Sequence, residues 1–195
     1  YYTPDRVCEQ YRRQFNKAHR WETKEERAFA RYSHFCKFTQ QRDAYGRRLP
    51  PCSRSFFASI ADASAGRLDV SPLNTVNDTS DPSLHNGHRL LRNGTSLPLS
   101  DHGRYKYLLD TDGFTSAYKL QQLLAINSVV LHHRSPWRAY FYDALHAFVH
   151  YVPLWQSSAD DVLRLIDWLR EHDGIARRIA INGQACACDG NDGAC

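Results

Sequence analysis

The chain has 195 residues, of which 42% are hydrophobic and 24% are charged, and its formal net charge is +4. These proportions are typical of a globular domain and exclude a wholly disordered chain. No apolar stretch approaches the roughly 20 residues that a membrane helix needs. The chain opens Tyr1-Tyr2 and contains no methionine, so we expect a fragment or a processed product.

Positive charge is concentrated in the first quarter of the chain. Residues 1–54 hold 13 Lys and Arg against 6 Asp and Glu. Such a segment attracts nucleic acid, anionic lipid or a phosphorylated small molecule, and a solvated basic face is an equally good interpretation. No nucleic-acid-binding motif accompanies the charge, so we expect no nucleic-acid partner.

The first half of the chain predicts few elements. Residues 28–32 favour a short strand, which would place Arg31 at a strand-to-loop junction. Apolar spacing in residues 54–63 predicts a helix, ended by Gly66, and residues 68–70 favour a second strand. Residues 71–101 are rich in Pro, Asn, Gly and Ser, which indicates a long loop with at most one short helix.

The pattern is sharper from residue 104 onward. It predicts strands at residues 105–109, 129–131 and 148–152, and helices from Thr115 or Ser116 to 124, over 137–145, 158–172 and 175–183, with a break at Gly174. Alternating strands and helices predict an α/β sandwich with a parallel sheet. The tail, residues 186–195, is expected to be frayed.

Six cysteines and two glycosylation sequons bear on the compartment. No cysteine pair has CxxC spacing, which argues against a zinc site. The sequons begin at Asn77 and Asn93, and together with the even cysteine count they favour an oxidising, secretory compartment. Cys36 and Cys52 bracket a loop and are our preferred disulfide, with two buried free thiols as the alternative.

The turn after the 105–109 strand is the main candidate site. Ligands bind at the carboxyl ends of strands in an open parallel sheet, and free backbone N–H groups at a helix start favour phosphate. Lys119 lies within reach of the same anion. An ordinary strand–turn–helix connection explains the pattern as well.

Histidines and aspartates supply weaker candidates. His150 and Tyr151 at a predicted strand end could bond a ribose, phosphate or sugar hydroxyl. His132 and His133, before Arg134, would point to opposite faces of a strand, which argues against chelation by both. A further pair, Asp110 and Asp112, is commoner as turn chemistry than as a metal-binding motif.

An ordered set of segments resembles a known family. It comprises YKYLLDTDGFTSAYKL at 105–120, LLAINSVVL at 123–131, SPW at 135–137, FY at 141–142, VHYVP at 149–153 and IAING at 179–183. These resemble glycosyltransferase family 90, the capsule-associated and Rumi-type protein O-glucosyltransferases. The resemblance covers about residues 21–185, leaving 1–20 as the remnant of an upstream segment.

The resemblance implies a Rossmann-like lobe of a GT-B glycosyltransferase. The implied reaction is an inverting, metal-independent transfer of glucose or xylose from a UDP-sugar to a protein or glycan hydroxyl, with no cofactor, in the lumen of the endoplasmic reticulum or Golgi. Arg31 and Lys119 would neutralise the diphosphate. The remaining implied donor-site residues are Lys106, Asp112, Gly113, Thr115, Ser116 and Ala117, with His150 as a weaker candidate.

Three departures from the family pattern matter. Lys119 stands where the family usually has Arg, which keeps the charge but loses bidentate phosphate binding. Ala139 stands where an acidic residue commonly accepts from the ribose. The catalytic base of the family lies in an amino-terminal lobe, so no catalytic residue is assigned here. The alternatives are a catalytically inactive nucleotide-sugar-binding module and a basic secreted interaction domain.

Overall fold

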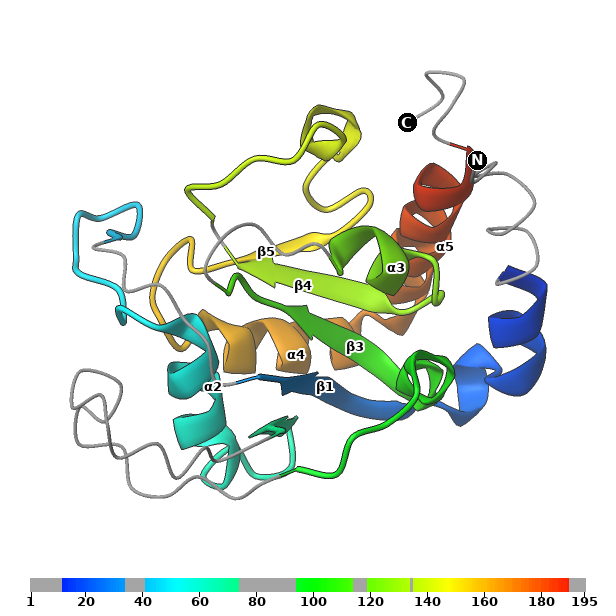
Figure 1. The fold of residues 1–195 in the computed structure, drawn as a ribbon, viewed down its shortest axis with the longest axis horizontal. Coiled ribbons are helices and arrows are strands. Elements are labelled where there is room, and N and C mark those ends of the chain that lie inside the picture. Colours follow the sequence, from blue (N-terminus) through cyan, green and yellow to red (C-terminus); the bar gives the residue numbers. More distant parts are fainter. Residues whose placement is uncertain (1–11, 34–40, 74–93, 114–118, 134, 190–195) are drawn as a thin grey trace.

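The computed structural model describes residues 12–33, 41–73, 94–113, 119–133 and 135–189. A five-stranded sheet runs through the described residues in the order β2-β1-β3-β4-β5 (Figure 1). Every pair of neighbouring strands is parallel, as the alternation of strands and helices predicted. The strands are β1 (Glu25–Tyr32), β2 (Leu68–Pro72), β3 (Tyr105–Asp110), β4 (Val129–His133) and β5 (Val152–Leu154).

Helices cover both faces of the sheet (Figure 1). On β4, Val129 and Leu131 pack in one cluster with Phe57 and Ile166, whereas Val130 between them packs with Leu124 on the opposite face. Because both faces are covered, every residue of β3 and β4 is buried. The helices are α2 (Ser53–Ala61), α3 (Leu120–Leu124), α4 (Asp161–Glu171) and α5 (Asp173–Asp189), and residues 12–18 are also helical.

An ion-pair network around the buried Lys106 fixes the edge at which the strands begin. Lys106, the second residue of β3, contacts the carboxylates of Glu26 at 2.8 Å and Asp173 at 2.6 Å. The indole N–H of Trp21 donates to the same Asp173 carboxylate. These contacts join the start of the sheet to the first turn of α5.

Two segments differ from their predicted structure. The predicted strand 148–152 begins only at Val152, because His150 N–H and Phe148 N–H donate into a tight turn, to His146 O and Tyr151 O. The predicted helix 137–145 is reduced to a 3-10 helix at Tyr142–Ala144.

The predicted frayed tail is wrong for residues 186–189, because α5 continues to Asp189. Cys186 and Cys188 are buried there and disulfide-bonded. Cys52 is also disulfide-bonded, but Cys36 lies outside the described residues, so the Cys36–Cys52 pairing stays a prediction. The predicted break at Gly174 falls instead at His172, between α4 and α5, and Gly174 lies inside α5.

Lys24 is buried without a carboxylate partner among the described residues. It is 5% exposed, and its ammonium donates to Asn127 O and to Ser128 Oγ, each at 2.8 Å. Burial lowers the pKa of Lys24 from 10.5 to about 7. The folded protein therefore releases this proton at a pH where the unfolded chain still holds it.

We expect the free energy of unfolding to rise with pH between about 7 and 10.5, since the unfolded chain binds more protons throughout that window. The slope from this one group is at most about 1.4 kcal/mol per pH unit. Urea unfolding of the wild type, Lys24→Met and the exposed control Lys17→Met at several pH values tests this. An identical slope in the wild type and Lys24→Met would contradict it.

Candidate anion-binding edge of the sheet

The strand order places a topological switch point between β1 and β3. The chain leaves β1 toward β2 on one side of the sheet and leaves β3 toward β4 on the other. In doubly wound sheets of this order, ligands bind in the crevice at the carboxyl ends of the two strands that flank the switch point. Ser33 and Thr111, the first residues after β1 and β3, mark this place.

Arg54 joins the two strand ends. From the first turn of α2, its guanidinium donates to Ser33 O at 2.9 Å and to Thr111 O at 3.4 Å. Gly113 makes room for it, because a Cβ at that position would lie 3.1 Å from one Arg54 nitrogen. Burial lowers the pKa of Arg54, but a guanidinium remains charged at neutral pH. The switch point therefore carries a fixed positive charge.

Arg31 and Lys119 add charge beside Arg54. Arg31 donates to Asp69 Oδ1 at 2.6 Å and to Asp69 O at 2.7 Å, so its charge is already partly compensated. Lys119 is exposed, and its side chain makes neither a hydrogen bond nor an ion pair with any described residue. Protein around its ammonium, and then the charge of Arg54, lower the pKa of Lys119.

The charges of both Lys119 and Arg31 act on the buried His102. Burial first, and then the charge of Lys119, lower its pKa to about 4, and Arg31 contributes in the same direction. A neutral, 4%-exposed imidazole thus lies beside two cations. Arg31 near the end of β1, Arg54 in α2 and Lys119 directly before α3 thus place three cationic side chains at the carboxyl edge of the sheet. Such cations make this edge a candidate site for an anion.

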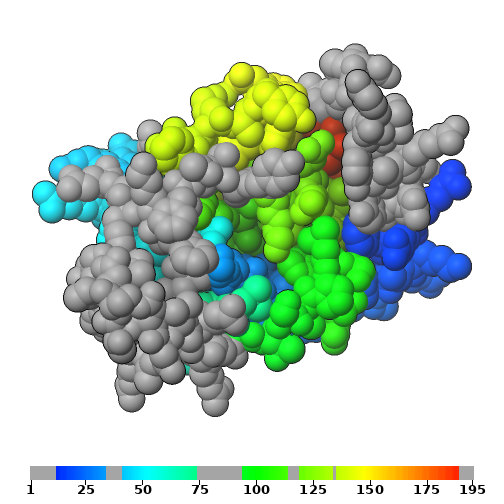
Figure 2. All heavy atoms as spheres, viewed as in Figure 1, coloured from blue at the N-terminus to red at the C-terminus, as the bar shows by residue number. Residues whose placement is uncertain are grey.

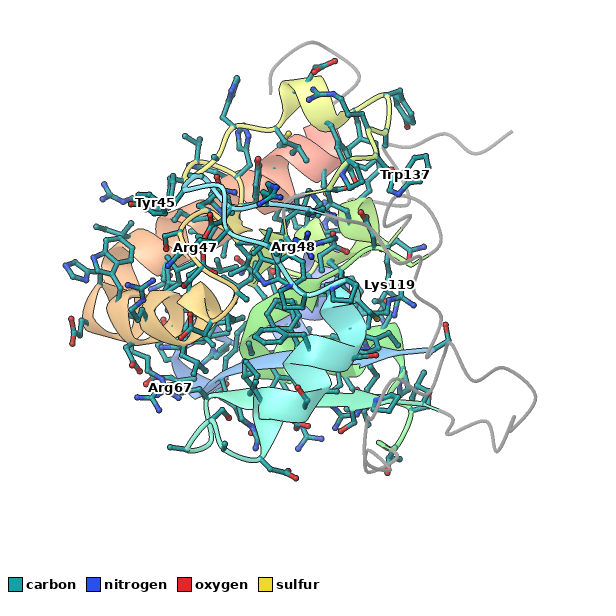
Figure 3. All side chains as sticks on the ribbon, turned by 90° about the vertical axis from the view of Figure 1, so that its left-hand side faces the viewer. Tyr45, Arg47, Arg48, Arg67, Lys119 and Trp137 are labelled. Atoms are coloured by element: carbon teal, nitrogen blue, oxygen red, sulfur yellow. The ribbon has the colours of Figure 1, made fainter. Side chains whose placement is uncertain are left out.

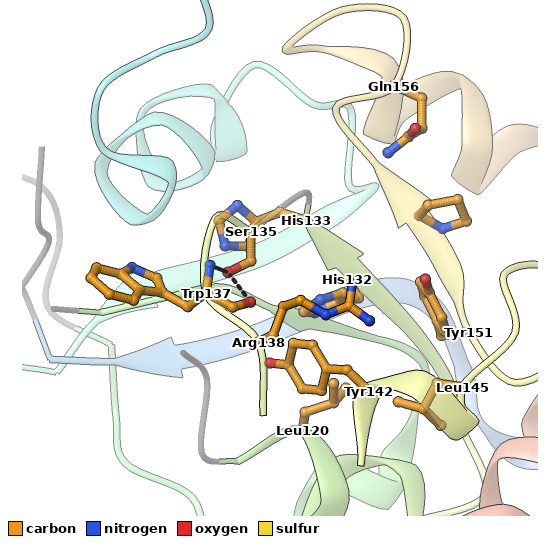
Figure 4. Close-up of a pocket in the computed structure, with 11 residues that line it drawn as sticks. Leu120, His132, His133, Ser135, Trp137, Arg138, Tyr142, Leu145, Tyr151 and Gln156 are labelled. Carbon is orange, nitrogen blue, oxygen red and sulfur yellow. Dashed lines mark hydrogen bonds between the residues drawn. The ribbon is translucent and has the colours of Figure 1, made fainter. Parts of the chain in front are cut away.

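A pocket of about 230 Å³ lies beside this edge, at the ends of β4 and β5 (Figure 4). Its lining includes His132, Ser135, Tyr142 and Tyr151. The His132 ring meets the rings of Tyr142 and Tyr151 edge to face, each at 5.5 Å between centroids. The segment that encloses the pocket, residues 135–151, forms a ridge along the molecule, yellow in Figure 2. The pocket therefore combines aromatic rings with a lining that is more polar than apolar.

Two aspartates at the end of β3 hold the pocket together. Asp110 is 2% exposed, and its Oδ2 lies 2.7 Å from His132 Nδ1. Asp112 N–H donates to His133 Nε2 at 2.9 Å, and Ser135 Oγ donates to the Asp112 carboxylate. Both carboxylates therefore contact β4 or the loop that follows it.

The two histidines lie on opposite faces of β4, as predicted. His133 contacts Trp155 in one core cluster, whereas His132 contacts Tyr142 and Tyr151 on the other side. Among the described residues no group of three His, Cys, Asp or Glu side chains could hold a metal ion.

The structure brings together only part of the predicted site. Asp112 and Gly113 lie at the carboxyl edge with Arg31 and Lys119, whereas Thr115, Ser116 and Ala117 lie outside the described residues, as does Arg134. Lys106 does not belong to this group, because its ion pairs with Glu26 and Asp173 hold it at the opposite edge.

His150 is also separate from the carboxyl edge. It precedes β5, and its Nδ1 accepts from His146 N–H at 2.9 Å. Burial and then His146 lower its pKa, so a neutral His150 serves the turn before the strand.

Arg54 is the main residue that site prediction missed. A signal was available, because the helix that follows a strand in a parallel sheet starts at the carboxyl edge, and Arg54 lies at the predicted start of such a helix.

The family model of glycosyl transferase family 90 matches residues 9–189. The chain belongs to this family. It is 34% identical over 150 residues to protein O-glucosyltransferase 2 of Danio rerio, covering 77% of this chain and 28% of that protein. It is 31% identical over 166 residues to the O-glucosyltransferase rumi homolog of Anopheles gambiae, covering 84% of this chain and 36% of that protein. The chain thus spans about a third of the length of these relatives.

A solved structure shares the fold. It is the C-terminal domain of a glycosyl transferase group 1 family protein from Francisella tularensis, matched with a TM-score of 0.51 and 9% identity over 93% of this chain and 92% of that domain. The predicted fold class, a Rossmann-like lobe of a GT-B glycosyltransferase, is confirmed. Within the described residues, no helix is both long and apolar enough to span a bilayer.

We expect Asp110→Ala to lower the free energy of unfolding by about 1–3 kcal/mol, since it leaves the buried His132 Nδ1 without its partner. Asp143→Ala is the matched control, because the Asp143 carboxylate is 83% exposed and pairs with the exposed Arg138. Exposed pairs contribute about 0–1 kcal/mol. Equal losses in urea unfolding of the two variants would refute a structural role for the Asp110–His132 contact.

Proposed function

We propose that this chain supplies the donor-binding lobe of a UDP-sugar-dependent glycosyltransferase. The proposed reaction moves glucose or xylose to a protein or glycan hydroxyl, with inversion and without a metal. The observation that carries the proposal is the convergence of Arg31, Arg54 and Lys119 on the switch point. The family and the names of the relatives, which are O-glucosyltransferases, support the same reaction class.

The charges suit the leaving group of this reaction. When the bond from the sugar to UDP breaks, negative charge develops on the terminal phosphate, and fixed cations that await it lower the barrier. Arg54 suits the role best, because its bonds to Ser33 O and Thr111 O fix the guanidinium before a ligand arrives. Lys119, which has no partner among the described residues, is available to pair with the phosphate directly.

The neighbouring pocket suits the nucleoside. Tyr142 and Tyr151 offer aromatic surface, and the Tyr142 hydroxyl is buried with no hydrogen-bond partner among the described residues. Ala139 lies in the same loop, and its methyl side chain offers no carboxylate to a ribose. The Ala139 carbonyl accepts from Tyr142 N–H at 3.1 Å. We therefore assign the nucleoside to this pocket and the diphosphate to the three cations.

We place the protein in the lumen of the secretory pathway. The disulfide-bonded state of Cys52, Cys186 and Cys188 supports an oxidising compartment. The sequons at Asn77 and Asn93, which lie outside the described residues, are consistent with that placement.

We expect UDP to bind the chain saturably in calorimetry, and Lys119→Ala and Arg54→Ala each to weaken binding about 10-fold, since a hydrogen bond to a charged group contributes about 1.5–3 kcal/mol. Arg31→Ala should weaken it less, because Asp69 already shares that charge. Affinity should fall as pH rises and Lys119 loses its proton, and this fall should be absent in Lys119→Ala.

The matched control is Arg104→Ala, an exposed arginine directly before β3 and so at the opposite edge of the sheet. A folded wild-type chain that does not bind UDP would overturn the proposal, as would equal weakening by Arg104→Ala. These 195 residues alone should not transfer sugar, because the family resemblance implies that the catalytic base lies in an amino-terminal lobe outside them.

A further inference from the structure

A short hairpin presents arginines and a tyrosine to solvent. Residues 41–49, here called the arginine hairpin, contain Arg42, Arg47 and Arg48 around Tyr45. Arg42 and Arg48 face each other in an antiparallel bridge, and Asp43 N–H donates to Arg47 O at 3.0 Å. Gly46 completes the turn with φ +76°, a conformation that favours glycine.

The hairpin is held in one conformation by Asp43. Its buried carboxylate accepts from Tyr45 N–H and Arg47 N–H, each at 2.9 Å, and from Arg47 Nε at 2.6 Å. Ala44 N–H donates to Gln156 O at 3.0 Å, which ties the tip to the loop after β5. An ordered surface loses little conformational entropy when a partner binds.

The hairpin presents tyrosine and arginine side chains to solvent, and these residue types dominate protein interfaces. Tyr45 is 75% exposed, and the Arg47 guanidinium lies 5.3 Å from the centre of its ring. Arg48 is exposed, and its side chain makes no hydrogen bond or ion pair with a described residue. The Arg48 side chain takes no part in holding the hairpin, and the Tyr45 ring is largely open to solvent apart from its contact with Arg47. Tyrosine and arginine are enriched among residues that carry binding energy.

The hairpin shares an edge of the molecule with the anion-binding residues. Figure 3 looks onto the side at which the strands end in Figure 1, and Arg48 lies between Arg47 and Lys119 in this view. If the donor binds at Lys119, an acceptor must approach the same side to reach the sugar.

We propose that the arginine hairpin docks an acidic segment of the acceptor polypeptide, an inference that rests on the proposed function. The positive charge of Arg48 is uncompensated by any described carboxylate, so it fits Glu or Asp. The affinity of a long polyanion scales with the number of charges neutralised. One arginine without a side-chain partner, in the same hairpin as an exposed tyrosine, fits a protein segment better than such a polymer.

The test uses the 195-residue chain and two labelled peptides of equal length, one rich in Glu around a central Ser-Gly and its twin with Gln for every Glu. Fluorescence anisotropy should show the Glu peptide binding about 10-fold more tightly than the Gln twin. The double variant Tyr45→Ala/Arg48→Ser should lose this preference. Arg178→Ser, which removes an exposed arginine of α5, should keep it. Circular dichroism checks that each variant folds.

Several outcomes would overturn the proposal. These are equal binding of the two peptides, no effect of the double variant, or an equal effect of Arg178→Ser. Tighter binding of a heparin fragment or of phosphatidylserine vesicles through the same two residues would also overturn it, in favour of a polyanion or a membrane surface. Parallel UDP titrations separate the two proposals. If UDP fails to bind but the Glu peptide is still preferred, the proposed donor site is wrong and the proposed docking surface is supported. If UDP binds but the Glu peptide is not preferred, only the proposed docking surface is wrong.

Discussion

The candidate site depends on one guanidinium, that of Arg54, at the carboxyl ends of β1 and β3. Arg54 spans the ends of β1 and β3 by donating to the carbonyl oxygens of Ser33 and Thr111. Two parallel strands that diverge at a switch point leave carbonyl groups at their ends that no further strand pairing satisfies. A cation that satisfies these acceptors also leaves positive charge in the crevice. The same contacts therefore connect the two strand ends and make the candidate site positively charged.

The lysines at the two edges of the sheet differ in whether carboxylates compensate their charge. At the edge where strands begin, Lys106 is neutralised by Glu26 and Asp173 and joins β3 to α5. At the edge where strands end, the Lys119 ammonium is influenced by Arg54 and, more weakly, by Asp110, and it makes no ion pair with a described carboxylate. A cation compensated by carboxylates stabilises a fold, whereas an uncompensated one beside another cation attracts an anionic ligand.

Two aspartates near the end of β3 have structural roles. Asp110 and Asp112 follow each other with one residue between them, a spacing that suggests either turn chemistry or a metal. The structure uses them instead to fasten β3 to β4, through His132 and His133. The pocket beside the switch point therefore keeps its shape through buried hydrogen bonds, while the exposed charges nearby stay available.

The sequence by itself determined the approximate positions of β1 to β4, the parallel sheet and the family. A strand buried on both faces is a continuous apolar run and a helix buried on one face has helical apolar spacing, and both patterns are visible in the sequence. It also placed Arg31 and Lys119 at the correct edge, since both follow or end a predicted strand. The sequence did not predict the position of Lys106, because the residues next to it do not show that it pairs with Glu26 and Asp173. It failed too for the 146–151 turn, where His146 and Tyr151 satisfy backbone groups that a strand would have paired.

Only the tertiary structure decided which charges are compensated. Apart from the bond of Arg31 to its neighbour Ala30, the partners of Arg31, Arg54 and Lys106 lie between 21 and 80 residues away along the chain. Local periodicity carries no information about contacts at that separation. The sequence set how many cations the chain has, and the packing of the strands set which of them remain open to a ligand.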